Sequence, residues 1–398
     1  MILYLNVFLF LLFLIPLFLT INFIFYSKKI KRRIQKLENV YIPNVSIIIP
    51  FRQFDYNLPY TLRALASQKY KGNYEILFVS SEQDTEVVRF IKEGIKNLKN
   101  AKFIQAVETN KYRSDKVNNL MEGINHLQEN CEVIVVMDSD IVPHSTWISD
   151  LVRPLQLGDC GASSGSSWIT AKKEDFLCFA TRYWDFLATI QMCYKPTSFI
   201  RGFSMAFKKS IFDKLKIMEV WNNAFHDNLT LTTKLKQCGY KLYFSPHCLV
   251  NHCFNIEGKE WVKWVRRQSI NTKINYPNLW RWGMIFMILP RMMGALGFLV
   301  TLALLLSRIY HAWFIPFLFW PVLHLINAAS LIFALYKEHG NMRHLLREKI
   351  KIIFCSFGSV LLGFGSLGSL FSNKILWRGR TYKQESPYTT VTIDRGHN

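Results

Sequence analysis

The sequence predicts an α/β fold in which a mostly parallel sheet carries helices on both faces, with transmembrane helices before and after that domain. Three observations support this prediction. Short β-branched runs alternate with helical stretches in the middle of the chain, an uncharged apolar run opens it, and further apolar runs lie near its end. Half of the 398 residues are hydrophobic, and this surplus collects at the two ends.

The predicted strands are short apolar runs in the middle domain, which is expected to cover residues 44–275. Residues 45–50 form a β-branched run closed by proline, which is typical of a buried parallel strand. The same pattern predicts strands at 74–79, 101–106 and 131–137, with helices at 58–68, 85–96 and 117–129. Ligands bind such sheets at the carboxyl ends of the strands, so polar residues just after a strand are candidates for a site.

Residues 1–27 are predicted to form a transmembrane helix, because residues 1–26 are almost all apolar and carry no charge. Such a run can span about 30 Å of hydrocarbon. It lacks the positive start and the small-residue cleavage site of a signal peptide. A basic linker follows at residues 28–43 and opens with Lys-Lys-Ile-Lys-Arg-Arg. By the positive-inside rule, this linker and the middle domain are expected to be cytosolic.

The C-terminal third is predicted to contain an interfacial segment at 276–291 and a membrane region at 292–372. Candidate spans lie at 295–307, 312–336 and 352–371. The first is short unless it includes residues 282–290, so two or three spans are both compatible with the sequence. The side of the membrane on which the tail, residues 373–398, lies is open for the same reason.

The charge of the chain is strongly basic, with 49 Lys and Arg against 28 Asp and Glu and a formal net charge of +21. Much of this excess lies beside the apolar segments, where anionic headgroups attract basic residues by about 1 kcal/mol each. The expected partner is therefore an anionic membrane surface and not a nucleic acid. The eight cysteines are expected to be reduced; Cys248 and Cys253 lie near two histidines but lack the second close pair typical of structural zinc.

Asp138 and Asp140 directly follow the predicted strand at 131–137. Two carboxylates spaced i, i+2 can hold a divalent metal, Mg²⁺ or Mn²⁺, which neutralises a diphosphate. An isolated Asp-x-Asp is more often a solvated turn, but its place after a buried strand of an α/β domain favours the metal site.

Three further residues are candidates on weaker grounds. Asp84 follows the strand at 74–79, although alone it would more often be a helix N-cap. Asp227 opens a predicted helix and could also be only a cap. His226 beside it is expected to be an orienting or buried residue, with the role of the base as its alternative. Lys116 is a candidate phosphate partner, with a solvated lysine as its alternative interpretation.

Motifs along the whole chain resemble those of the ceramide glucosyltransferases and their bacterial relatives, which are membrane-bound inverting enzymes of the GT-A fold. Residues 50–58, Pro-Phe-Arg-Gln-Phe-Asp-Tyr-Asn-Leu, are similar to the family's Pro-x-Lys-Gly-x-Asp-x-Asn-Leu. Residues 116–120, Lys-Val-Asn-Asn-Leu, are similar to its Lys-hydrophobe-Asn-Asn-Leu segment. Residues 377–382, Trp-Arg-Gly-Arg-Thr-Tyr, are similar to its Trp-Arg-x-x-x-Tyr tail.

The resemblance implies a role for each acidic candidate. Asp84 falls where the family has its first essential aspartate, Asp138 begins the second aspartate motif, and Asp227 matches the third, which is the catalytic base. Pro50 and Lys116, with these aspartates, are then expected to line the nucleotide-sugar site.

One motif departs from the family pattern, which ends the catalytic domain with Gln/Arg-x-x-Arg-Trp. Residues 264–269, Trp-Val-Arg-Arg-Gln-Ser, occupy that region, with Arg267 as the counterpart of the arginine and Gln268 in place of tryptophan. A second register, over residues 260–264, is also open. Arg266, Arg267 and Gln268 are therefore the candidates that would steady the departing diphosphate.

The predicted function is inverting transfer of a hexose, glucose first, from a UDP-sugar to the hydroxyl of a lipid acceptor such as ceramide. The expected location is a multi-pass membrane protein with a cytosolic catalytic domain, in a bacterial inner membrane or in the Golgi or ER. The alternatives are a processive polysaccharide synthase, which would need an intact Gln-x-x-Arg-Trp, or a polyprenyl-phosphate sugar transferase. Intact acidic residues at three strand or helix ends disfavour a non-catalytic scaffold. The sequence does not indicate an oligomeric state.

Overall fold

The computed structural model describes residues 2–37, 41–107, 111–171, 175–253, 258–309, 317–327, 329 and 358–394. The chain forms two compact units, and each combines segments that are distant in sequence. The sheet unit comprises Lys29–Thr170, Lys195–Phe254 and Asn373–Asn398. The helical unit comprises Met1–Lys28, Ala171–Tyr194 and Asn255–Ser372.

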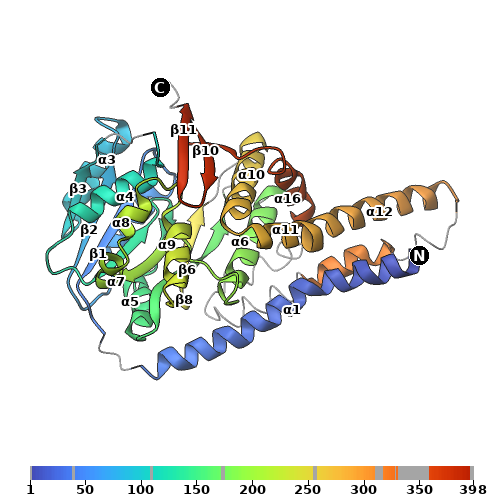
Figure 1. Cartoon of the computed structure of the whole chain (residues 1–398), viewed down its shortest axis with the longest axis horizontal. Coiled ribbons are helices and arrows are strands. Elements are labelled where there is room, and N and C mark those ends of the chain that lie inside the picture. The colour runs from blue at the N-terminus through green and yellow to red at the C-terminus, as the bar shows by residue number, and fades with distance from the viewer. Residues whose placement is uncertain are drawn as a thin grey trace. The chain divides into compact units, whose positions relative to one another are not determined.

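An eight-stranded sheet of order β3-β2-β1-β4-β7-β6-β8-β5 forms the centre of the sheet unit (Figure 1). Its strands are β1 (Val45–Pro50), β2 (Tyr74–Ser80), β3 (Ala101–Gln105), β4 (Val133–Met137), β5 (Ile141–Val142), β6 (Cys160–Thr170), β7 (Ser204–Lys208) and β8 (Lys241–Cys253). Strands β3, β2, β1 and β4 are parallel, as are β6 and β8. Strand β7 is antiparallel to both of its neighbours, and β5 is antiparallel to β8.

The α/β class predicted from the sequence is confirmed, and the sheet is mixed: β7 and β5 run antiparallel to the other strands, which all run in one direction. The strands at β1, β2 and β4 are continuous apolar runs that are almost fully buried, which is why their pattern was recognisable. The strands β5 to β8 were not predicted, because they lack such continuous apolar runs. Strand β6, for example, is Cys-Gly-Ala-Ser-Ser-Gly-Ser-Ser-Trp-Ile-Thr.

The described helices of the sheet unit are short, and two of them are capped by side chains. They are α2 (Leu58–Ala66), α3 (Glu86–Gly94), α4 (Asp115–Asn125), α5 (Trp147–Val152), α7 (Lys209–Lys214), α8 (Ile217–Trp221) and α9 (Asp227–Gln237), with 3-10 turns η1 (Ile95–Asn97) and η2 (Arg153–Gln156). The side chain of Ser114 accepts a hydrogen bond from the backbone of Val117 and so starts α4. A Cβ at Gly123 would lie 2.6 Å from Ile48 of β1, so glycine lets α4 pack directly on the sheet.

The tail of the chain forms a second, three-stranded antiparallel sheet of order β11-β10-β9 within the sheet unit (Figure 1). Its strands are β9 (Lys374–Trp377), β10 (Arg380–Ser386) and β11 (Thr389–Asp394). Two backbone hydrogen bonds attach β11 to loops of the unit: Thr390 donates to Asn223 at 3.0 Å and Thr392 donates to Lys111 at 2.7 Å. The last residues of the chain therefore complete a unit that begins near its start.

The helical unit contains α6 (Phe176–Met192), α10 (Gly258–Asn275), α11 (Pro277–Gly283), the π-helix η3 (Met284–Ile288), α12 (Leu289–Leu306) and α16 (Gly358–Leu367). Helix α1 (Ile2–Gln35) begins in this unit and ends in the sheet unit. Close packing of α16 on α6 depends on Gly358, where a Cβ would lie 2.3 Å from the backbone of Ala180.

Elements α11, η3 and α12 form one helix, Pro277–Leu306, which contains an 18-residue stretch with a mean hydropathy of 1.9. Among the described residues it is the helix that is both long and apolar enough to cross a membrane. It passes through the segment predicted to be interfacial, so the short candidate span at 295–307 does include residues 282–290. Shorter apolar helices at Phe317–Asn327 and Gly358–Phe371 cover parts of the other two candidates, whose remaining residues lie outside the described ranges. The transmembrane helices at the two ends and the domain boundaries stay predictions.

Candidate functional site

Lys116 lies between two carboxylates that come from different elements of the sheet unit. The lysine is in the first turn of α4, Asp138 follows β4, and Asp227 begins α9. Its Nζ is 2.7 Å from Oδ1 of Asp138 and 3.6 Å from Oδ2 of Asp227. It also donates a hydrogen bond to the carbonyl of Gly202 at 3.2 Å. The structure thus brings together three residues that the sequence singled out separately.

The charges around Lys116 fix its protonation state. Burial lowers the pKa of the ammonium, but the nearby carboxylates of Asp138 and Asp227 outweigh it and raise the pKa above its usual value. For Asp138, burial raises the pKa of the carboxyl by more than Lys116 lowers it. Lys116 is therefore a permanent cation at the carboxyl ends of the central strands.

Asp140 has the features of a metal ligand. Its Oδ2 lies 3.3 Å from Nε2 of His252 on β8, while its Oδ1 is buried and finds no hydrogen-bond donor in the described part of the chain. Burial raises the pKa of Asp140, but His252, Arg378 and Lys116 together lower it further, so its pKa lies below the ordinary value. An ionised carboxylate with an unsatisfied buried oxygen suits a divalent cation.

The donor set available to a metal is small. Within the described ranges, no three His, Cys, Asp or Glu side chains form a group that could hold an ion by themselves. Asp138 and Asp140 would therefore supply at most two of the oxygen ligands of such an ion. Substrate phosphates and water would supply the others. This arrangement fits Mg²⁺, which proteins commonly bind through one or two carboxylates plus phosphate oxygens.

The loop after β1 holds the backbone of the Asp138–Asp140 turn in place. Asp55 accepts a hydrogen bond from the hydroxyl of Ser139 at 2.7 Å, and Asn57 donates one to the carbonyl of Asp140 at 2.8 Å. Burial raises the pKa of Asp55 by more than the nearby Arg378 lowers it. In the sequence this loop is part of the motif at residues 50–58, and the structure shows which groups its polar residues contact.

A chain of ion pairs lies next to Lys116. Oxygen Oδ2 of Asp115 accepts from Arg52 at 2.6 Å, and Oδ1 accepts from Arg380 at 2.6 Å. Arg52 also contacts Glu82 at 2.9 Å. Because Asp115 directly precedes Lys116 in α4, these pairs fix the start of the helix that carries the lysine.

Asp84 does not join this cluster. Its side chain is 85% exposed, its backbone is left-handed with φ of 46°, and it pairs with Arg89 of α3 at 3.2 Å. Glu82, two residues earlier in the same loop, is the acidic residue that reaches the cluster through Arg52. Pro50 ends β1 and is buried. The nucleotide contacts expected of Asp84 and Pro50 stay predictions.

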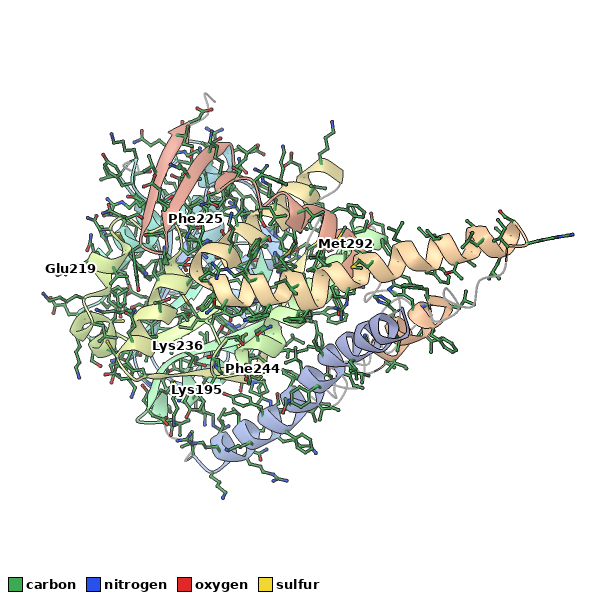
Figure 2. All side chains as sticks on the ribbon, turned by 45° about the vertical axis from the view of Figure 1, so that its right-hand side comes forward. Lys195, Glu219, Phe225, Lys236, Phe244 and Met292 are labelled. Atoms are coloured by element: carbon green, nitrogen blue, oxygen red, sulfur yellow. The ribbon has the colours of Figure 1, made fainter. Side chains whose placement is uncertain are left out.

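Asp227 is the most deeply placed carboxylate of the site, with only 2% of its surface exposed. Its Oδ2 has no hydrogen-bond partner within the described ranges, and a Cβ at Gly202 would lie 3.2 Å from that oxygen. The neighbouring ring of Phe225, which is labelled in Figure 2, packs edge-on against His226 with a centroid distance of 4.6 Å. The same ring contacts Trp377 and Tyr382 of the C-terminal strands. The C-terminal strands thus support the start of α9.

The remaining candidates, Arg266, Arg267 and Gln268, lie on α10 of the helical unit. Gly368 lies close to Arg266, since a Cβ there would be 3.2 Å from the arginine Cδ. Their role toward a diphosphate stays a prediction.

Several residues of the cluster have no role that could be assigned from the sequence alone. Arg52, Asp55, Arg378 and Arg380 lie inside motifs that were quoted for the resemblance, so a signal was present without an assigned role. Glu82 and Asp115 had no local signal. His252 was considered only for a zinc site, whereas the structure pairs it with Asp140.

The chain belongs to glycosyl transferase family 21, whose model matches residues 9–387. This is the ceramide glucosyltransferase family, so the resemblance seen in the motifs is confirmed. The search of curated proteins found no match.

Two solved structures are similar to the chain at low identity. The mannosyltransferase PcManGT from Pyrobaculum calidifontis, in complex with GDP-Man and Mn²⁺, is 15% identical with a TM-score of 0.49, over 92% of this chain and 99% of that one. GalNAc-T7 with UDP, GalNAc and Mn²⁺ is 13% identical with a TM-score of 0.41, over 61% of this chain and 51% of that one. Because both TM-scores are below 0.5, neither structure supports a role for any residue of this site.

Proposed function

We propose that this glycosyltransferase moves a hexose, with glucose as the first candidate, from a UDP-sugar to the hydroxyl of a membrane lipid such as ceramide, at the cytosolic membrane face. The observation that supports it most is the pairing of Asp138 and Asp227 through Lys116. One carboxylate of this set is available to the donor and the other to the acceptor, on either side of a fixed positive charge.

Asp227 is the proposed base. Inversion takes one in-line displacement: the acceptor oxygen bonds to the anomeric carbon while the bond from that carbon to the diphosphate oxygen breaks. The proton of the acceptor hydroxyl goes to Asp227, whose buried Oδ2 has no competing hydrogen bond among the described residues. General-base catalysis of this kind contributes about 10²–10⁴-fold.

The donor side of the site is assigned to Asp138, Asp140 and Lys116. The two aspartates would hold Mg²⁺ or Mn²⁺, which when bound neutralises the charge of the diphosphate. Lys116 lies 2.7 Å from Asp138 and adds a cation beside the same group. Asp84 and Pro50 are proposed to contact the nucleotide, and Arg266, Arg267 and Gln268 to steady the departing diphosphate.

A lipid hydroxyl is proposed as the acceptor for two reasons. The family is a membrane glycosyltransferase family, and Pro277–Leu306 is long and apolar enough to enter a bilayer. In addition, a phosphate acceptor would arrive already ionised and would need no base, whereas the site contains a buried carboxylate suited to accept a proton. A polyprenyl phosphate is therefore the less favoured acceptor.

Lipid mass spectrometry of a host that lacks glycolipids tests the proposal. We expect a new hexosyl lipid when the chain is expressed, and none with Asp227→Asn expressed to the same level. Membranes supplied in parallel with UDP-glucose, UDP-galactose and GDP-mannose then identify the donor. A water-soluble polymer in place of a glycolipid, or equal product from the variant, would contradict the proposal.

A further inference from the structure

The C-terminal hairpin places an arginine beside the acidic cluster, although its residues come last in the chain. Nη2 of Arg378 lies 3.3 Å from Oδ1 and 3.4 Å from Oδ2 of Asp55. Asp55 in turn accepts from Ser139, which lies between the two candidate metal ligands. Arg378 therefore reaches the donor side of the site.

The turn that carries Arg378 has a backbone conformation that arginine rarely adopts. Arg378 and Gly379 link β9 to β10 as a two-residue hairpin loop, and both have positive φ, of 47° and 78°. Two positive φ values are characteristic of a type I′ turn, for which Asn-Gly is the preferred sequence. A non-glycine, non-asparagine residue in this conformation indicates a constraint from outside the turn.

The two arginines of this hairpin differ in how firmly they are held. Arg380 has 8% of its side chain exposed and is 2.6 Å from Asp115, which Arg52 contacts from the other side. Arg378 has 25% of its side chain exposed, and its ion pair within the described residues is the longer one with Asp55, at 3.3 and 3.4 Å. Arg380 is thus a structural brace, whereas Arg378 is accessible and loosely held.

The electrostatics of Arg378 agree with this placement. Burial lowers the pKa of its guanidinium, but Asp55, Asp140 and Asp138 outweigh it and raise the pKa. The influence is mutual, since Arg378 also lowers the pKa of Asp140. The nearby aspartates therefore hold the Arg378 guanidinium in its charged form.

We propose that Arg378 is a binding residue for the donor diphosphate, delivered to the site by the C-terminal hairpin. Its guanidinium would form charge-assisted hydrogen bonds to phosphate oxygens, a geometry for which arginine is well suited. Asp55 holds the side chain in position when no donor is bound. This inference rests on the proposed nucleotide-sugar donor and adds a residue for the departing group.

The key variant is Arg378→Asn in the full-length protein, because it removes the charge and also creates the preferred Asn-Gly turn. We expect its UDP affinity, measured by calorimetry with Mn²⁺ present, to fall by about tenfold to a hundredfold, as for the loss of a charged hydrogen bond. Uridine, which has no phosphate, should change by less than about twofold because base contacts remain. Arg378→Lys should recover part of the loss.

Lys383→Gln is the matched control, since Lys383 is exposed on β10 and pairs only with the nearby Glu385 in the described structure. It removes the same charge from the same hairpin and should leave UDP affinity unchanged. Thermal melting of each variant separates binding from folding. We expect Arg378→Asn to melt no lower than the parent, because the substitution relieves the backbone strain.

The double variant Asp55→Asn, Arg378→Asn separates the proposed role from a bracing role. If Arg378 only neutralises Asp55, removing both charges should restore UDP affinity, and that restoration would overturn the inference. Equal losses for UDP and uridine would overturn it as well. If the parent protein bound no UDP, the proposed donor itself would be wrong, whereas UDP binding unaffected by Arg378→Asn would refute the role of Arg378 alone.

Discussion

Two loops of the sheet unit each follow a buried strand and each carry an aspartate that the sequence singled out, yet they have different environments. The loop after β4 places Asp138 against Lys116 at 2.7 Å. The loop after β2 leaves Asp84 largely exposed and paired with Arg89. In that second loop Glu82, not Asp84, connects to the cluster.

A position at the end of a strand is therefore not enough by itself to identify a site residue. β4 is central, between β1 and β7, whereas β2 lies beside the edge strand β3. Asp138 also donates its backbone N–H to the carbonyl of Phe203 at 3.1 Å, which fixes its direction. Asp84 has a left-handed backbone that turns its side chain toward α3.

Removal of divalent metal is expected to have the largest effect. Chelation should abolish sugar transfer, and added Mn²⁺ or Mg²⁺ should restore it, because Asp138 and Asp140 would hold the ion that neutralises the diphosphate. Asp138→Asn should lower transfer more than Asp140→Asn. Radiolabelled sugar transfer to extracted lipid measures both effects. Full activity in excess chelator would remove the metal from the mechanism.

Asp227→Asn should lower turnover by at least about 10²-fold, because asparagine cannot accept the proton of the acceptor hydroxyl. Its size and its place at the start of α9 are preserved, so UDP binding should persist. His226→Gln is the neighbouring comparison and should cost far less if the histidine only orients Asp227. A dead His226→Gln with an active Asp227→Asn would move the base by one residue.

Glu82→Gln and Asp84→Asn directly compare the two acidic residues of the loop after β2. Glu82→Gln breaks a 2.9 Å ion pair with Arg52 and should reduce kcat/KM for the donor by about tenfold, as for a lost charged hydrogen bond. Asp84→Asn removes an exposed pair and, on this geometry, should change it by less than about twofold. The opposite order would restore Asp84 as the functional acid of this loop.

The smallest difference is expected between the stability costs of removing two helix caps, Ser114 of α4 and Thr85 of α3. Ser114→Ala removes the cap of α4 and the 2.7 Å hydrogen bond from the Ser114 hydroxyl to the Phe225 carbonyl. It should therefore cost about 1–2 kcal/mol of stability. Thr85→Ala removes only the cap of α3 and should cost about 0.5–1 kcal/mol. Denaturation in detergent measures both; a larger cost for Thr85→Ala would show that the loop after β2 is the more tightly constrained.

By itself, the sequence determined the strands with continuous apolar runs and the residues that follow them. β1, β2 and β4 could be predicted because burial on both faces of a sheet requires such runs, and Asp138 was located by the same argument. Helix α9 does begin at Asp227, as the pattern predicted. These features depend on interactions over a few residues, which a local pattern records.

Only the tertiary structure decided which charges meet. Arg378 contacts Asp55 across 323 residues and Arg380 contacts Asp115 across 265 residues, and no local pattern specifies either pair. The strands of the mixed half of the sheet could not be predicted from hydrophobic patterning either. Small polar residues such as those of β6 form a strand only where neighbouring strands supply hydrogen bonds. Long-range pairing depends on how the whole chain packs, so the hairpin that reaches the acidic cluster is evident only in the folded molecule.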